Sequence, residues 1–185
     1  MKHPIARARA ADSVLLVVDL QEKLMPVIHE GRRVLEEARK VIQVANLLQV
    51  PILATEQYPK GIGPTCAEIK QALGDVTIYE KLTFSGCGAE HFMPRWEQIK
   101  RHTAIVCGVE AHVCVQQTVL DLLERDQHVL VLANAMSSRH PRDYELALQR
   151  MNQAGATVTT AESVIFELLG RAGTPEFKEA LKLVK

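Results

Sequence analysis

The sequence predicts an α/β protein in which a Rossmann-like parallel sheet is covered by helices on both faces. Apolar runs of strand length recur along the chain, and segments with helical spacing lie between them. Continuous apolar runs are typical of strands buried on both faces, and strands that alternate with helices indicate a parallel sheet. The expected architecture is therefore a three-layer α/β/α fold around a six-stranded sheet.

The elements follow one another along the chain in a regular order. The apolar runs predict strands at residues 14–18, 51–54, 77–79, 103–107, 129–132 and 157–159. Helical spacing is clearest for the apolar residues Val34, Ala38, Val41, Ile42, Ala45 and Leu48, and again for Val115, Val119, Leu122 and Leu123. A proline in the first turn predicts a last helix at about 174–184, which would serve for packing or for oligomer contacts.

Length and composition favour one domain that binds a small molecule. A chain of 185 residues with 47% hydrophobic content fills one core and is short for two. We expect a single domain over residues 1–185, with its core at about 12–170. The 22 basic and 22 acidic residues cancel, so the net charge favours neither a nucleic-acid backbone nor an anionic membrane as the partner.

The chain contains four cysteines, at positions 66, 87, 107 and 114. The apolar run 14–18 is too short for a signal peptide or a membrane span, so we expect a cytoplasmic protein with reduced thiols. The cysteines form no C-x-x-C pair and no short ladder with histidines. A zinc site of the structural cysteine–histidine type is therefore not expected, and we expect no cofactor.

Polar residues follow four of the predicted strands. Asp19 ends the first strand, Glu56 and Gln57 follow the second, Lys81 follows the third, and residues 108–114 follow the fourth. The carboxyl ends of parallel strands meet at the edge where open α/β sheets bind ligands. We therefore expect these four loops to converge on one site.

Cys114 is the candidate nucleophile because it opens a predicted helix, 115–125. A helix N-terminus favours a thiolate over a thiol, and its N–H groups can receive an oxyanion. The alternative is that Cys114 is a small buried hydrophobe. Cys107 lies within a strand and is expected to be inert core, and Cys66 and Cys87 occupy loop-like segments without a nearby base.

Asp19 and Lys81 are the candidate charged partners of Cys114. A carboxylate at the end of an aliphatic strand is costly to desolvate unless it is paired or used, and it could take the thiol proton and later return it. A lysine in the same cleft would lower the pKa of the thiol and hold the carboxylate. The alternatives are that Asp19 caps a turn and that Lys81 is solvated. Glu80 is expected to face solvent by strand alternation.

Five stretches of the chain, in the same order and covering nearly all of it, carry a resemblance to a known family. They are Val17-Val-Asp-Leu-Gln21, Glu56-Gln-Tyr-Pro59, Glu80-Lys-Leu-Thr-Phe-Ser85, Gly108-Val-Glu-Ala-His-Val-Cys-Val115 and Ala135-Met-Ser-Ser-Arg139. The chain resembles the isochorismatase-like cysteine hydrolases, whose superfamily also contains nicotinamidases and N-carbamoylsarcosine amidohydrolases. It looks most like the isochorismatase-domain-containing branch, whose members often lack an assigned substrate.

The resemblance implies a role for each of these residues. Asp19 would be the general acid/base, Lys81 its electrostatic partner and Cys114 the nucleophile. It also implies a non-proline cis peptide at Val109–Glu110, which with Cys114 would turn backbone N–H groups towards the reacting oxygen. The implied reaction is cleavage of a small amide or related C–N bond through a thioester.

Two departures from better-known relatives narrow this expectation. Nicotinamidases carry an aspartate and two histidines as metal ligands after the second strand, where this chain has Glu56–Tyr58 and no histidine between His29 and His91. A metal-assisted nicotinamidase is therefore not expected. Isochorismate-cleaving relatives hydrolyse a vinyl ether and need no cysteine at the position of Cys114.

The remaining expectations concern the pocket and the partners. Loop position suggests Gln21, Tyr58 and Phe84 as pocket walls, and His112 either lines the pocket or bonds to the turn beside it. Asn134 stands where relatives commonly have an aspartate, and it has no assigned role. The resemblance implies a homo-oligomer, a dimer or larger. The alternatives to a hydrolase are a non-catalytic small-molecule-binding or scaffold protein with the same fold and, with less support, a redox-sensing thiol.

Overall fold

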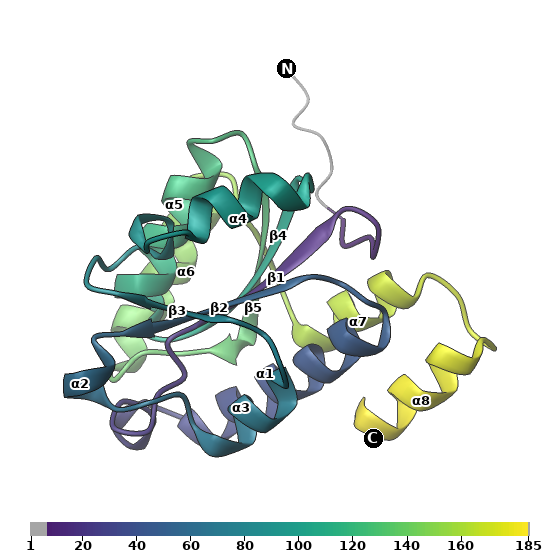
Figure 1. Cartoon of the computed structure of the whole chain (residues 1–185), viewed down its shortest axis with the longest axis horizontal. Coiled ribbons are helices and arrows are strands. Elements are labelled where there is room, and N and C mark those ends of the chain that lie inside the picture. The colour runs from purple at the N-terminus through teal and green to yellow at the C-terminus, as the bar shows by residue number, and fades with distance from the viewer. Residues whose placement is uncertain (1–6, 185) are drawn as a thin grey trace.

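A computed structural model describes residues 7–184 and has a single parallel sheet at its centre (Figure 1). The order of its six strands is β3-β2-β1-β4-β5-β6, and every neighbouring pair is parallel. The strands are β1 (Ser13–Val18), β2 (Ile52–Gln57), β3 (Ile78–Lys81), β4 (Thr103–Gly108), β5 (His128–Met136) and β6 (Thr157–Thr159). The predicted fold class is therefore confirmed.

Helices cover both faces of the sheet, as Figure 1 shows. One layer contains α1 (Gly31–Leu47), α3 (Ala67–Leu73), α7 (Ala161–Leu169) and α8 (Pro175–Val184). The other contains α4 (Phe92–Ile99), α5 (Gln116–Leu123) and α6 (Pro141–Gln153). The short elements are α2 (Pro59–Ile62), two 3-10 turns at Met25–Val27 and Gly86–Gly88, and a π-helical turn at Ala111–Val115.

The side chains of β1 contribute alternately to two hydrophobic clusters, one on each face of the sheet. Its side chains point to opposite faces in turn, so Leu15 and Val17 join the cluster under α1, whereas Leu16 and Val18 join the cluster under α5. All six residues of β1 are buried. This explains why the strand reads as a continuous apolar run in the sequence.

Gly108 lies where the chain leaves β4 beside the end of β1. Its φ is +123°, and a Cβ built there would lie 2.0 Å from the carbonyl oxygen of Val18. The next residue, Val109, donates its N–H to the same carbonyl at 2.9 Å. β1 and β4 lead to opposite sides of the sheet, so their ends form the topological switch point at which such sheets bind ligands.

The structure extends some predicted elements. β2 and β5 run on to Gln57 and Met136, because polar residues near their ends are hydrogen-bonded within the protein. The helix that contains Cys114 begins one turn earlier than predicted, in the π-helical turn. The prediction of one domain over 1–185 stays a prediction, and its residues 1–6 and 185 lie outside the described part. Across residues 7–184, every helix is too short or too polar to cross a bilayer.

Candidate active site

Asp19 and Lys81 form a buried ion pair at the ends of β1 and β3. Lys81 Nζ lies 2.7 Å from Asp19 Oδ2, and both side chains are inaccessible to solvent. Lys81 also donates to Gln57 Oε1 at 2.7 Å and to the carbonyl of Phe84 at 2.9 Å. These contacts hold the ammonium in one place, so the alternative of a solvated lysine is wrong. Glu80 is exposed, as alternation predicted.

Two residues of β2 belong to this cluster: Gln57, which the sequence placed at this edge without a role, and Thr55, which it did not single out. Thr55 Oγ1 donates to Asp19 Oδ1 at 2.7 Å, so each carboxylate oxygen of Asp19 has its own donor. Gln57 lies two residues further along the same face of β2 and bonds to Lys81. The sequence held a signal for both, because polar residues at alternate positions of a buried strand point to one face. Glu56 faces away and binds Thr65 at 2.6 Å.

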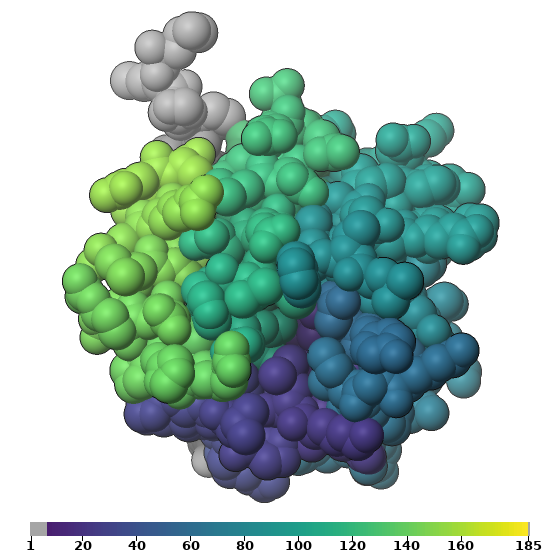
Figure 2. Space-filling model, turned by 90° about the vertical axis from the view of Figure 1, so that its left-hand side faces the viewer, coloured from purple at the N-terminus to yellow at the C-terminus, as the bar shows by residue number. Residues whose placement is uncertain are grey.

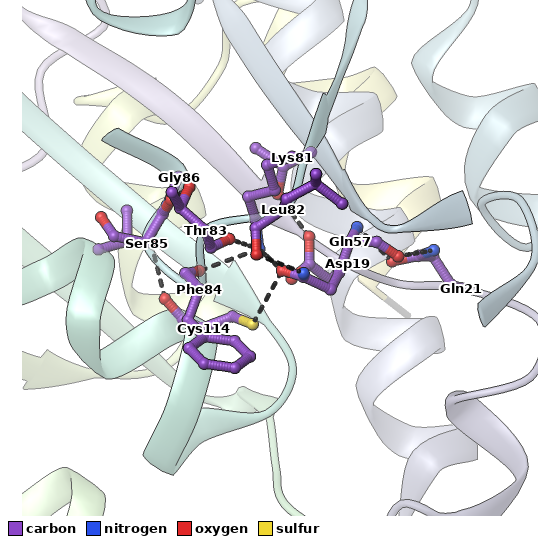
Figure 3. Close-up of polar contacts among 12 residues, drawn as sticks. Asp19, Gln21, Gln57, Lys81, Leu82, Thr83, Phe84, Ser85, Gly86 and Cys114 are labelled. Atoms are coloured by element: carbon purple, nitrogen blue, oxygen red, sulfur yellow. Dashed lines mark hydrogen bonds and ion pairs between the residues drawn. The ribbon is translucent and has the colours of Figure 1, made fainter. Parts of the chain in front are cut away.

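Cys114 lies beside this pair, as Figure 3 shows. Its side chain is 7% exposed, and Sγ is 3.9 Å from Gln57 Oε1. Burial and the negative charge of Asp19 raise the pKa of the Cys114 thiol from 9.0 to about 12, although Lys81 acts in the opposite direction. Lys81 lowers this pKa, as expected, but burial and the charge of Asp19 outweigh it, so the net shift is upward. Cys114 rests as a thiol with a carboxylate close by.

The loop before Cys114 contains the non-proline cis peptide Val109–Glu110. Glu110 is buried, and its carboxylate accepts hydrogen bonds from the backbone N–H of Arg139 at 2.9 Å and from Arg139 Nε at 3.1 Å. The loop after β5 is thus bonded to the turn that carries Cys114. Ala111 N–H donates to the carbonyl of Ser137 at 2.8 Å, which adds a second bond between the same two loops.

The predicted pocket residues differ in exposure. Tyr58 and Phe84 are 50% and 54% exposed. Tyr58 lines a hollow of about 280 Å³ with Lys81 and Leu82, and its N–H donates to the carbonyl of Lys81 at 2.9 Å. Figure 2 faces the loops at this edge, where the purple, blue and teal parts of the chain meet at the surface. Tyr58 and Phe84 stay predicted pocket walls.

Gln21 lies behind the site, so its prediction as a pocket wall is wrong. It is fully buried, and its amide binds the backbone of Gln57 on both sides, donating to the carbonyl at 3.0 Å and accepting from the N–H at 2.7 Å. It also donates to the carbonyl of Gly63 at 2.6 Å. A side chain whose polar atoms are satisfied by backbone supports the site and has no surface for a ligand.

His112 and Asn134 bind neighbouring elements. The His112 ring lies 2.9 Å from Ser138 Oγ, a side chain of the loop after β5 and not the backbone of its own turn, and its place as a pocket residue stays a prediction. Asn134 Nδ2 donates to Glu37 at 2.7 Å, and its Oδ1 accepts the N–H of Ala161 at 2.8 Å. Asn134 therefore connects β5 to α1 and to the start of α7.

The other cysteines lie in the predicted kinds of environment. Cys107 is fully buried in β4, and burial raises its pKa to about 12. Cys66 and Cys87 are half-buried at the start of α3 and in the Gly86–Gly88 turn. Within residues 7–184, histidine, cysteine and acidic side chains form no group of three that could hold a metal ion.

The fold and the site together define a class of protein: an open parallel α/β sheet with a thiol and a buried aspartate–lysine pair at its switch point. A family model described as the isochorismatase domain matches residues 13–163. The chain therefore belongs to the isochorismatase-like hydrolase family.

Similar proteins extend this match over nearly the whole chain. Isochorismatase domain-containing protein 2 of Bos taurus is 39% identical over 98% of this chain and 87% of its own length. A structure named MAR1 ribonuclease from Caenorhabditis elegans is 41% identical, with a TM-score of 0.91 over 97% of this chain and 92% of that one. The YcaC gene product of Escherichia coli, described as an octameric hydrolase of unknown specificity, shares the fold at 22% identity, with a TM-score of 0.88 over 99% and 89% of the two chains.

Proposed function

We propose that the protein is a cysteine hydrolase that cleaves a small amide or related C–N bond through a thioester at Cys114. The observation that carries the proposal is the convergence of Asp19, Lys81 and Cys114, from three separate strand ends, at the switch point of the sheet. A thiol that rests protonated needs a base within reach. The Asp19 carboxylate is that base.

The first half-reaction forms the thioester. The Cys114 thiol transfers its proton to Asp19, and the sulfur attacks the carbonyl carbon, so that a C–S bond forms and the C=O π electrons move to oxygen. In this proposal the backbone N–H groups of Glu110 and Cys114 stabilise the oxyanion, because those of Val109 and Ala111 donate to the carbonyls of Val18 and Ser137. The oxyanion collapses, the C–N bond breaks, and Asp19 returns its proton to the leaving nitrogen.

The second half-reaction releases the product. Asp19 takes a proton from water, whose oxygen attacks the thioester carbon, and the C–S bond breaks as Cys114 recovers the proton from Asp19. Lys81 stays charged throughout and stabilises the carboxylate whenever Asp19 is ionised. Each half-reaction therefore returns Asp19 to its starting state.

The test is a turnover screen on small amides that measures released ammonia or amine. Cys114→Ser should abolish turnover, and Asp19→Asn should reduce kcat by about 100- to 10,000-fold while the fold is retained. Acid quenching of the wild-type protein should trap an acyl group on the peptide that contains Cys114, found by mass spectrometry. Cys107→Ala serves as the control and should keep its activity, because Cys107 is buried core.

The alternative of a non-catalytic binding or scaffold protein predicts a different outcome of the same screen. Compounds that raise the melting temperature but are never turned over, with no acyl adduct on Cys114, would contradict the hydrolase proposal. An RNA substrate belongs in the screen because the similar structure from C. elegans is named a ribonuclease. Phosphodiester cleavage that survives Cys114→Ser would also contradict it.

A further inference from the structure

The side chain of Gln57 contacts both the lysine and the cysteine of the site. Its Oε1 accepts a hydrogen bond from Lys81 Nζ at 2.7 Å and lies 3.9 Å from Cys114 Sγ. Its Nε2 donates to the carbonyl of Leu82 at 3.1 Å. Figure 3 places its side chain between Asp19 and Gln21. One amide thus contacts the charged partner and the thiol together.

The surroundings permit only one orientation of this amide. The Lys81 ammonium can only donate a hydrogen bond and the Leu82 carbonyl can only accept one, so Oε1 must face Lys81 and Nε2 must face Leu82. The backbone of Gln57 is fixed as well, because Gln21 binds its N–H and its carbonyl. The oxygen is consequently the atom presented to Cys114.

We propose that Gln57 is a positioning residue of this site: its side-chain oxygen anchors the Lys81 ammonium beside Asp19 and keeps an electronegative atom facing the Cys114 thiol. The inference rests on the proposed function, which makes Cys114 the nucleophile. An oxygen next to the sulfur opposes formation of the thiolate, whereas it accepts the S–H of the thiol. Gln57 therefore favours the protonated state until Asp19 removes the proton.

The charges that act on Cys114 come from two strands. They are the Asp19 carboxylate, just after β1, and the Lys81 ammonium at the end of β3. β2 contributes the uncharged Thr55 and Gln57. Glu110, at the start of the helix of Cys114, is paired with Arg139. The Gly86–Gly88 turn places Cys87 against the hydrophobic cluster under α5, to which Cys114 also belongs.

The test compares two substitutions at Gln57 that should act in opposite directions on the thiol. Gln57→Glu keeps the shape but adds a negative charge, and Gln57→Met keeps the length but removes the oxygen. The measurement is the rate at which iodoacetamide alkylates Cys114 as a function of pH, resolved by peptide mass spectrometry. Below the thiol pKa this rate follows the thiolate fraction, which changes tenfold for one unit of pKa.

We expect Gln57→Glu to slow alkylation of Cys114 by at least about tenfold and Gln57→Met to accelerate it severalfold. Turnover should nevertheless fall in both variants, because Lys81 is no longer held in the same way. The same two substitutions at Gln71, an exposed residue of α3, are the matched controls and should change neither rate. Cys107 should stay unlabelled in every folded variant, since it is fully buried.

Three results would overturn the inference. Equal alkylation rates in wild type and both Gln57 variants, or a change in the same direction in both, would mean that Gln57 only fills space. A folding defect would appear as labelling of Cys107. If iodoacetamide does not reach Cys114, the same thiol can be titrated by the ultraviolet absorbance of its thiolate, with Cys114→Ser as the blank. A titration curve that is the same in wild type and both Gln57 variants would contradict the inference. If the wild-type protein shows neither turnover nor an acyl adduct on Cys114, that result would contradict the proposed function alone.

Discussion

At the scale of residues, the site depends on the buried pair of Asp19 and Lys81. Both side chains are inaccessible to solvent, and every oxygen of the carboxylate has a donor. A buried ion pair contributes little net stability, but removal of one partner leaves an uncompensated charge. The site therefore tolerates the loss of both charges better than the loss of one.

Lys81→Met should lower the free energy of unfolding by about 3–5 kcal/mol, because it leaves the Asp19 carboxylate buried and unpaired. The measurement is urea unfolding at neutral pH. Lys81→Met combined with Asp19→Asn should regain a large part of that loss. A double variant as unstable as the single one would show that the charge of Asp19 is not the cause.

The sequence identified Asp19, Lys81 and Cys114 as neighbours because each follows a strand, and the sheet brings such positions together. It could not give the sign of the shift in the Cys114 pKa, because that sign depends on how burial and two opposite charges balance. The sequence placed Gln57 at the same edge of the sheet, but it could not show which groups the amide binds. An amide reveals its partners only when the strands are placed in register.

At the scale of elements, Asn134 explains how β5 continues past its apolar run. Its amide group supplies a donor to Glu37 in α1 and an acceptor to the N–H of Ala161 at the start of α7. An aspartate would supply the acceptor but would place a second carboxylate against Glu37. The sequence therefore left the end of β5 unpredicted, since a polar residue inside a strand needs partners from distant helices.

Asn134→Asp should destabilise the protein by about 1 kcal/mol, because a partly buried hydrogen bond becomes a contact between like charges. Thermal unfolding at neutral pH measures the effect. Adding Glu37→Gln should restore stability, since the new amide can donate to the aspartate. Equal melting temperatures for wild type and Asn134→Asp would mean that the two side chains do not interact.

At the scale of the whole molecule, the thiols make stability depend on alkaline pH. The pKa values of Cys87, Cys107 and Cys114 are raised from 9.0 to about 11, 12 and 12. A group whose pKa is raised in the folded state stabilises that state fully below its unfolded pKa, and the stabilisation is lost as the pH rises towards the folded value. The window for this loss lies between pH 9.0 and about 12.

The free energy of unfolding should fall above pH 9 by about 1.4 kcal/mol per pH unit for each thiol that ionises only in the unfolded chain. Urea unfolding at a series of pH values measures the slope. Cys107→Ala should make the slope shallower by one thiol's share, whatever its effect on absolute stability. An unchanged slope would contradict the raised pKa of Cys107.

The protein should assemble as a homo-oligomer, as the family resemblance implies. Light scattering after size exclusion should give a multiple of 20.6 kDa, and a mass of one chain at micromolar concentration would refute the expectation. The structure makes α8 a weaker candidate for the contact than the sequence suggested. Ala180 is fully buried and Phe177 packs against Phe166 of α7, so part of the apolar face of α8 is already used within the chain.

The buried ion pair of the site and the exposed residues around it should differ in how freely they change during evolution. Asp19 and Lys81 are buried and bonded on every side, whereas Tyr58, Leu82 and Phe84 are at least half-exposed. Exposed loop positions accept substitution at little cost in stability, but a buried charged network does not. Mutation over generations should therefore alter the exposed positions freely and leave the buried pair unchanged, so that relatives that also keep the cysteine retain one chemistry while their substrates diverge.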